Sequence, residues 1–247
     1  MSRRKTALFT ANKDVATSFL KEIGESDVWE LLHLPLENYS YSINMEEEGL
    51  ILEKLDSFSF IIHGNLRNAR YFIQWVEESN ALEQVRNIVH LVPNQSSADF
   101  LAKLDIPAVM PREQARPIDT IEFMLRISRE GTVLYPTTDQ RDEEVPGLLK
   151  ELEMPVIEFQ VCKEKTLPSK LLEEYRDQIS NNSFDSVIFH SRSSVTRIQT
   201  AFPNLNLKSV ECISSGQAVT QKLQESELEP SIEARGSWRS LLATLNE

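Results

Sequence analysis

A run of polar residues, 190–193 (HSRS), follows directly on a short apolar segment, residues 187–189. Imidazole can donate, accept or transfer a proton near neutral pH, and the hydroxyls donate hydrogen bonds. Arg192 can pair with a carboxylate. The apolar segment predicts a buried parallel strand, and the residues after it predict a helix. Ligands of open α/β sheets bind at the carboxyl ends of the strands. This stretch therefore predicts part of a ligand site.

The same arrangement occurs earlier in the chain. Residues 59–65, SFIIHGN, place His63 after an apolar segment, as His190 is placed in the later copy. Each copy is followed by a second related stretch, residues 88–106 and residues 210–228. Aligned without a gap, these two stretches set Asn94 against Gly216.

The two copies lie about 120 to 130 residues apart, and an internal repeat is the first architectural signal to weigh. A period of this length predicts two similar domains and not a solenoid. The alternative is that the likeness is only the one that any two βα units share.

The composition is that of a globular protein with an acidic surface. The chain has 247 residues, of which 40% are hydrophobic and 26% charged, and its net charge is −12. This charge argues against a nucleic-acid-binding protein, and no apolar run approaches the roughly 20 residues of a membrane span. The basic N-terminus is not followed by the apolar core of a signal peptide. We therefore expect a cytoplasmic protein, a monomer, that binds neither nucleic acid nor membrane.

The residue types that bind metals are few. Cys162 and Cys212 are the two cysteines, too few for a disulfide framework or a zinc site. The four histidines show no metal-ligand spacing, so we expect no metal site. Because the overall charge repels anions, an anion site needs a local cluster of arginines and backbone N–H groups.

Strands and helices are predicted to alternate along the chain. The predicted strands cover residues 5–10, 58–62, 88–92, 106–110, 132–135, 186–189, 208–213 and 230–232. The predicted helices cover residues 14–23, 46–55, 67–78, 97–104, 117–129, 142–152, 171–179, 195–202, 217–225 and 237–245. This alternation predicts an α/β fold with parallel sheets and helices on both faces.

Two extended segments, residues 29–41 and 155–164, do not fit the alternation. If both cross between domains, the chain leaves the first domain near Leu36 and returns near Lys163. The prediction is a discontinuous domain of residues 1–36 plus 165–247, with an inserted domain of residues 37–164.

With these features the chain resembles the uroporphyrinogen-III synthase family over essentially its whole length. The family motif FTS-x-x-x-V is matched by IFHSRSSV at Phe189, Ser191 and Val195. A second motif, IG-x-x-TA-x-x-L-x-x-x-G, is resembled in both halves, through Gly216, Leu223 and Leu228 and through Ser97, Ala98, Leu101 and Ile106. Arg141 falls on the arginine of a further family segment, and the two crossing segments match the family's crossover.

Several positions depart from the family pattern. Cys162 stands where a tyrosine usually follows the valine of the return crossover, and Val219 replaces a threonine, with Thr220 next to it. Ala11 replaces an arginine after the first strand. Family glycines are replaced elsewhere, in keeping with only seven glycines in the chain.

The resemblance implies two flavodoxin-like domains joined by a two-stranded crossover. It also implies the substrate hydroxymethylbilane, an anionic linear tetrapyrrole with eight carboxylate side chains. The reaction removes water, inverts the last pyrrole ring (ring D) and closes the ring to uroporphyrinogen III. Holding the substrate in position, with mild acid assistance, would be enough, so no cofactor is expected.

The candidate site residues follow from the repeated strand ends and the motifs. Cys162, His190 and Thr220 are the candidate catalytic residues, although a nucleophilic role for the cysteine is not expected. The predicted substrate-binding residues are His63, Gly64, Asn65, Asn94, Ser97, Arg141, Ser191, Arg192, Ser193, Gly216, Gln217 and Thr220. Capping, packing or a surface position is the alternative for the histidines, hydroxyls and arginines.

Two other functions stay open. A binding or regulatory module that kept the two-lobed fold and lost the chemistry is favoured by the departures at Cys162 and Val219. A lobed sensor of a small sugar or amino acid rests on fold analogy alone.

Overall fold

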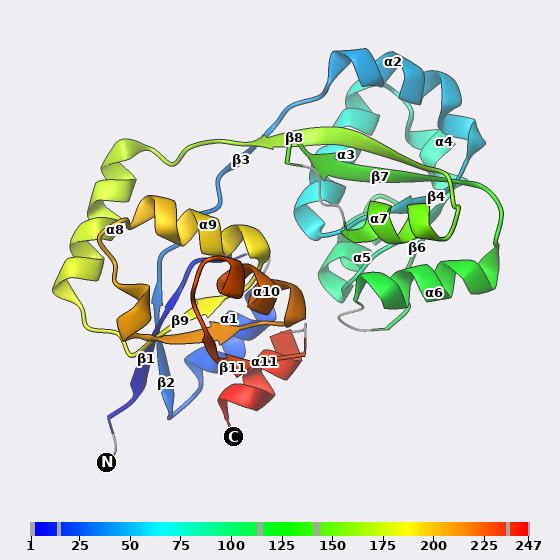
Figure 1. Cartoon of the computed structure of the whole chain (residues 1–247). Coiled ribbons are helices and arrows are strands. Elements are labelled where there is room, and N and C mark those ends of the chain that lie inside the picture. Colours follow the sequence, from blue (N-terminus) through cyan, green and yellow to red (C-terminus); the bar gives the residue numbers. More distant parts are fainter. Residues whose placement is uncertain (1–2, 14–15, 113–115, 141–143, 236–237, 247) are drawn as a thin grey trace. The chain divides into compact units, whose positions relative to one another are not determined.

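The computed structural model describes residues 3–13, 16–112, 116–140, 144–235 and 238–246, and its strands alternate with helices as predicted (Figure 1). The chain folds into two compact units. Unit 1 is Met1–Asn38 with Thr166–Glu247, and unit 2 is Tyr39–Lys165. That the units are separate domains with boundaries at residues 36/37 and 164/165 stays a prediction. No described helix is long and apolar enough to cross a membrane.

Unit 1 holds a parallel sheet of five strands in the order β11-β10-β9-β1-β2. In chain order this is 2-1-3-4-5, the order of flavodoxin. The strands are β1 (Lys5–Phe9), β2 (Trp29–His33), β9 (Ser186–Phe189), β10 (Glu211–Ser214) and β11 (Pro230–Glu233). The helices are α1 (Thr17–Gly24), α8 (Ser169–Asn181), α9 (Arg192–Ala201), α10 (Gln217–Glu225) and α11 (Trp238–Leu245), with a 3₁₀ turn η2 (Leu207–Ser209).

Unit 2 holds a six-stranded sheet in the order β3-β8-β7-β4-β5-β6, in which β3 alone is antiparallel. The strands are β3 (Tyr39–Tyr41), β4 (Phe58–Ile62), β5 (Val89–Leu91), β6 (Ala108–Val109), β7 (Thr132–Thr138) and β8 (Val156–Glu164). The helices are α2 (Met45–Lys54), α3 (Leu66–Glu78), α4 (Leu82–Arg86), α5 (Gln95–Ala102), α6 (Pro117–Ile127) and α7 (Glu144–Glu151), with a 3₁₀ turn η1 (Leu55–Ser57).

The parallel strands of the two units share one spatial order. β9, β10, β11, β1 and β2 of unit 1 correspond to β4, β5, β6, β7 and β8 of unit 2. The chain enters this arrangement at different points, because unit 1 contains both termini and is interrupted between β2 and β9. The repeat seen in the sequence therefore pairs β4 with β9 and β5 with β10.

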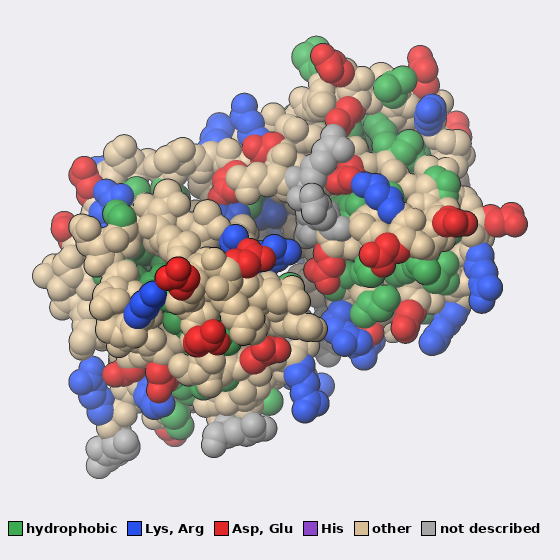
Figure 2. Space-filling model, viewed as in Figure 1, with side chains coloured by type: hydrophobic (Ala, Val, Ile, Leu, Met, Phe, Trp, Pro, Cys, Tyr) green, Lys and Arg blue, Asp and Glu red, His purple; other side chains and the backbone are tan. Residues whose placement is uncertain are grey.

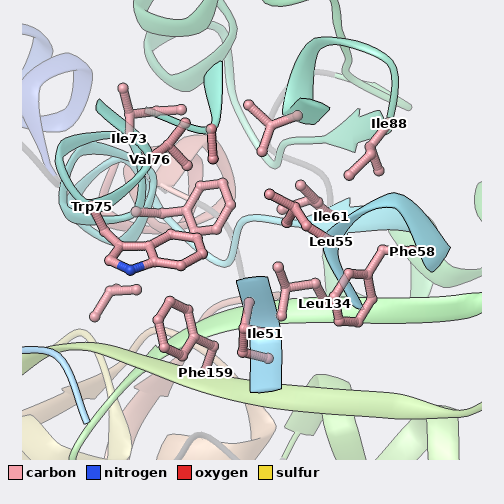
Figure 3. Close-up of a cluster of buried hydrophobic side chains, with 14 of the residues drawn as sticks. Ile51, Leu55, Phe58, Ile61, Ile73, Trp75, Val76, Ile88, Leu134 and Phe159 are labelled. Carbon is pink, nitrogen blue, oxygen red and sulfur yellow. The ribbon is translucent and has the colours of Figure 1, made fainter. Parts of the chain in front are cut away.

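Each sheet is covered on both faces. In unit 1, α8, α9 and α10 pack on one face and α1 and α11 on the other. In unit 2, α2, α3, α4 and α5 cover one face and α6 and α7 the other. Figure 3 shows the first of these unit 2 clusters, where Trp75 of α3 lies beside Phe159 of β8, with ring centroids 4.6 Å apart. Strands buried on both faces require the continuous apolar runs that the sequence has.

Three predicted segments differ in the structure. Residues 136–138, which lie outside the predicted strand 132–135, extend β7, and Pro136 is tolerated because the pairing of β7 with β4 ends at Leu134. The predicted strand 208–213 begins as a 3₁₀ turn, because the Asn206 side chain accepts from the Lys208 N–H. The extended segment from Trp29 begins as β2, parallel to β1, so its first part belongs to the unit 1 sheet.

Candidate functional site

Four helices begin at the carboxyl ends of the related strands, two in each unit. The cap residues are Asn65 for α3, Asn94 for α5, Ser191 for α9 and Gly216 for α10. In the first three, the cap side chain accepts the backbone N–H three residues later. These polar residues therefore serve as helix caps, and the helices begin earlier than the apolar pattern predicted.

The α10 terminus lacks a side-chain cap. Gly216 has extended backbone angles, and its own N–H donates to Ser214 Oγ at 3.2 Å. Among the described residues, nothing accepts from the N–H groups of Gln217 and Ala218. Exposed N–H groups at a helix N-terminus attract anions, so this end of unit 1 is suited to a carboxylate.

Beside α9 in unit 1, three charged or titratable side chains meet. Glu37 Oε1 lies 3.5 Å from His190 Nε2 and 3.3 Å from Arg197 Nη1. Glu37 Oε2 accepts the Asn12 N–H at 3.3 Å. The three side chains are only 4–12% exposed. A buried carboxylate needs such donors, and Glu37 contacts both the imidazole and the guanidinium.

The His190 ring is also held by packing. It stacks against Trp238 at 6.2 Å and meets the edge of Phe9 at 6.0 Å. Its Nδ1 is buried and has no hydrogen-bond partner among the described residues. His190 thus has Nε2 facing the Glu37 carboxylate and Nδ1 without a partner among the described residues.

The other predicted residues of unit 1 have local partners. The exposed Arg192 lies 3.6 Å from Glu225, and Ser193 Oγ accepts from Arg197 Nη1 at 3.0 Å. Thr220 Oγ1 lies 2.9 Å from Ser214 Oγ and 2.7 Å from Glu233 Oε2. A carboxylate and a hydroxyl thus hold the Thr220 side chain in place.

His63 in unit 2, predicted as a substrate-binding residue, is buried and belongs to a histidine pair. His90 Nε2 lies 2.9 Å from the Val85 carbonyl and must donate to it, so His90 Nδ1 accepts. His63 Nε2, 3.0 Å from that nitrogen, then donates. Burial holds the pKa of His63 well below its usual value and lowers that of His90 to about 4. Both rings are neutral packing groups.

Two further candidates are buried in unit 2. Ser97, predicted as a substrate-binding residue, is fully buried, and its hydroxyl donates to Asn94 Oδ1 at 2.9 Å. Cys162 is fully buried, and burial raises the pKa of its thiol to about 11. Burial thus disfavours the thiolate, which is the nucleophilic form of cysteine.

Gly64 fills a position that no side chain can occupy without a shift. A Cβ built there would lie 2.6 Å from the hydroxyl oxygen of Tyr135, which is buried in β7. Gly64 is exposed and leads into the Asn65 cap. Arg141, the last predicted binding residue, lies outside the described residues.

The predicted residues thus lie at the carboxyl ends of the strands in each unit. Some of them cap helices and others contact neighbouring side chains. His190, Ser191, Ser193, Gly216 and Gln217 lie at the unit 1 end, and Asn65 and Asn94 at the unit 2 end. The sequence did not reveal Glu37 or Arg197. The one available signal was that Arg197 stands four residues after Ser193 and so shares its helix face.

The remaining surface offers few alternatives. No group of His, Cys, Asp and Glu among the described residues is arranged to hold a metal. A pocket of about 250 Å³ lies between Phe202, Leu205 and Leu228, next to the C-terminal end of α9 and so away from the capped helix ends. On the face drawn in Figure 2, acidic and basic side chains are interspersed. Anion binding therefore depends on local donors.

Known proteins resemble this chain over most of its length. The family model described as uroporphyrinogen-III synthase HemD matches residues 52–242. The solved uroporphyrinogen-III synthetase of Helicobacter pylori is 15% identical, with a TM-score of 0.62 over 98% of this chain and 97% of that one. A mutant uroporphyrinogen III synthase of Thermus thermophilus is 11% identical, with a TM-score of 0.56 over 99% and 98%. No curated protein sequence matches the chain.

At these identities the two structures show a common fold. The family model covers well over half of the chain, from α2 to α11, and so includes both copies of the repeat. The chain therefore belongs to the uroporphyrinogen-III synthase family, a family of lyases.

Proposed function

We propose that this chain converts hydroxymethylbilane to uroporphyrinogen III by dehydrating cyclisation with inversion of ring D. The observation that carries the proposal is the family match over residues 52–242. Loss of hydroxide from the substrate gives a reactive azafulvene cation, which also closes unaided to the type I isomer. The protein's task is to hold ring D so that it reacts through its substituted carbon.

The helix ends at the strand termini support this task. The substrate is a polycarboxylate, and the N–H groups of Gln217 and Ala218 have no described acceptor. Arg192 is exposed next to the Ser191 cap and can reach a carboxylate in exchange for its long contact to Glu225. We assign these donors to substrate carboxylates. Positioning by fixed donors raises the rate without a covalent intermediate.

Acid assistance to the leaving hydroxyl is assigned to His190. Burial raises the pKa of the Cys162 thiol to about 11 and holds the pKa of His63 well below its usual value, and the Thr220 hydroxyl donates to Glu233. His190 keeps one nitrogen without a described partner, while Glu37 orients the other. An imidazole held at one nitrogen and open at the other can pass a proton through the open nitrogen.

A coupled assay tests the proposal. Hydroxymethylbilane is generated in situ, the protein is added, and the oxidised products are separated into isomers I and III. Isomer III is expected with wild-type protein. His190→Gln is expected to slow its formation by about 100-fold, the low end for loss of a general acid. Lys208→Gln, an exposed residue paired with Glu227, is the control and should match wild type.

A second candidate function is favoured by one observation. Cys162, which stands where the family's tyrosine is expected, is a buried thiol and has no hydroxyl to offer a ligand. The chain would then bind a tetrapyrrole without converting it. Folded wild-type protein that binds uroporphyrin III but leaves only isomer I would favour this function over the synthase. Monomeric state and cytoplasmic location remain predictions, of which size-exclusion chromatography with light scattering tests the first.

A further inference from the structure

Arg67 differs from the other arginines that the structure describes. Three of these arginines are half-buried: Arg67, Arg86 and Arg197. Arg86 pairs with Glu83, and Arg197 pairs with Glu37. Arg67 has no carboxylate partner among the described residues, although the chain carries 38 acidic side chains. Removing a cation from water without a counter-charge is costly, so an unpaired half-buried arginine is a position where an anion would be stabilised.

The Arg67 guanidinium is held in a defined place. Its central carbon lies 3.6 Å from the centre of the Tyr39 ring, the distance of a flat stacked contact. Tyr39 is itself fixed, because it pairs with Glu164 in the β3–β8 ladder and its carbonyl accepts from the Tyr71 hydroxyl at 3.0 Å. The guanidinium is thus pre-oriented by the backbone of unit 2.

Arg67 has a side-chain hydrogen bond to the neutral Cys162 thiol but keeps donors that no described oxygen accepts. Its Nε donates to Asn68 Oδ1 at 3.4 Å, a long contact, and no described oxygen accepts from its terminal nitrogens. Those nitrogens are the pair that binds a carboxylate in a fork. Stacking on a ring leaves the edge of the guanidinium open for this contact.

The surroundings of Arg67 add to its positive field. It lies in the first turn of α3, directly after the Asn65 cap, where the helix N-terminus favours negative charge. Cys162 is close enough that its thiol experiences the Arg67 charge, and that thiol is neutral. This thiol therefore adds no negative charge beside the guanidinium.

We propose that Arg67, stacked on Tyr39, is the carboxylate-binding residue of unit 2 and takes one acetate or propionate group of a polycarboxylate ligand. The identity of the ligand as a tetrapyrrole rests on the proposed function. The alternative is that the guanidinium only packs on the ring and contacts no ligand.

A binding titration separates these alternatives. The probe is uroporphyrin III, the oxidised octacarboxylate, whose fluorescence reports binding without reaction. Arg67→Gln is expected to raise Kd about tenfold, the loss typical of one charge-assisted contact. Arg67→Lys keeps the charge but loses the fork, and should raise Kd by about threefold.

Arg70→Gln is the matched control. Arg70 is exposed on the same helix, lies near an aromatic ring (Phe100, 6.0 Å), and its loss changes the net charge equally. Its Kd should stay within about twofold of wild type, because the Arg70 charge is exposed to screening solvent. The proposal is overturned if Arg67→Gln binds as wild type does, if Arg70→Gln weakens binding equally, or if wild-type protein does not bind the probe. Thermal unfolding of each variant shows that it is folded.

The isomer assay keeps this inference distinct from the proposed function. Wild-type protein that yields only isomer I, together with a weakened Arg67→Gln titration, rejects the synthase and retains the carboxylate site. Isomer III from wild type, with Kd and KM unchanged in Arg67→Gln, retains the synthase and rejects the site. If the chain is a synthase and Arg67 binds a carboxylate, Arg67→Gln should raise KM about as much as Kd, because it removes a contact made to the bound substrate.

Discussion

His63 and His190 occupy the same place in the two units, directly after the related strands β4 and β9, yet their surroundings differ. His63 is locked in a neutral pair with His90 of the neighbouring strand. His190 contacts the charged Glu37–Arg197 pair and keeps one nitrogen without a described partner. The two histidines therefore share a position in the repeat but not a chemical environment. His63 packs in a neutral pair, and His190 contacts charged side chains.

One residue accounts for part of this divergence. In unit 1, Ser191 follows His190 and is itself the cap of α9. In unit 2, Gly64 stands between His63 and the cap Asn65, so the turn is longer by one residue. The turn passes over the Tyr135 hydroxyl, which leaves room only for a glycine.

The largest expected effect is acid destabilisation of unit 2 through the histidine pair. Both folded pKa values lie below that of an unfolded histidine, about 6.5. As the pH falls below this value, the unfolded chain takes up protons first, so stability present at neutral pH is lost toward about pH 4 for His90. Each histidine contributes a slope of up to about 1.4 kcal/mol per pH unit.

Urea unfolding at several pH values measures this slope. Replacing Trp29 and Trp238 with Phe leaves Trp75, in unit 2, as the only tryptophan. His63→Leu/His90→Leu should flatten the decline of unfolding free energy below pH 6.5, even if it lowers stability at pH 7. An unchanged slope in this variant would show that other groups cause the acid loss.

In unit 1, the corresponding disruption is removal of Glu37. Glu37→Leu removes the carboxylate that contacts the buried Arg197 guanidinium and should cost about 3 kcal/mol of unfolding free energy at pH 7. Glu37→Leu/Arg197→Leu should cost less than the single change, because it removes the buried cation together with the carboxylate. Urea unfolding followed by Trp238 fluorescence reports on this unit, since that ring stacks on His190. Equal losses in the two variants would contradict a role for Glu37 as counter-ion.

The turn of unit 2 can be tested through a double-mutant cycle. Gly64→Ala should destabilise the protein by about 2 kcal/mol, because the added methyl overlaps the Tyr135 hydroxyl. Tyr135→Phe removes that oxygen and leaves the next ring atom at 3.4 Å, an ordinary contact. The cost of Gly64→Ala should therefore largely vanish in the Tyr135→Phe background. Additive effects in thermal unfolding would place the clash elsewhere.

Much of this fold follows from local pattern, and much of the site does not. Strands such as β4 and β9 are continuous apolar runs, which predict buried parallel strands directly. The starts of α5 and α9 were missed because their first turns carry polar residues that apolar spacing does not register. Glu37 and Arg197 are 160 residues apart, and their contact depends on tertiary packing. The same holds for His63, whose burial depends on His90 in the next strand.

The smallest effects come from the helix caps. They compare α5 of unit 2 with α10 of unit 1, the helix at the equivalent position. Asn94→Ala should cost about 1 kcal/mol, because Oδ1 accepts both the N–H and the hydroxyl of Ser97. Gly216→Ser, at the equivalent position of α10, should add a cap and gain only a few tenths of a kcal/mol. If α10 binds a carboxylate, the new hydroxyl competes for the same N–H groups, so Kd for uroporphyrin III should rise while stability does not fall. Unchanged affinity in a stabilised Gly216→Ser protein would show that this helix end binds no ligand.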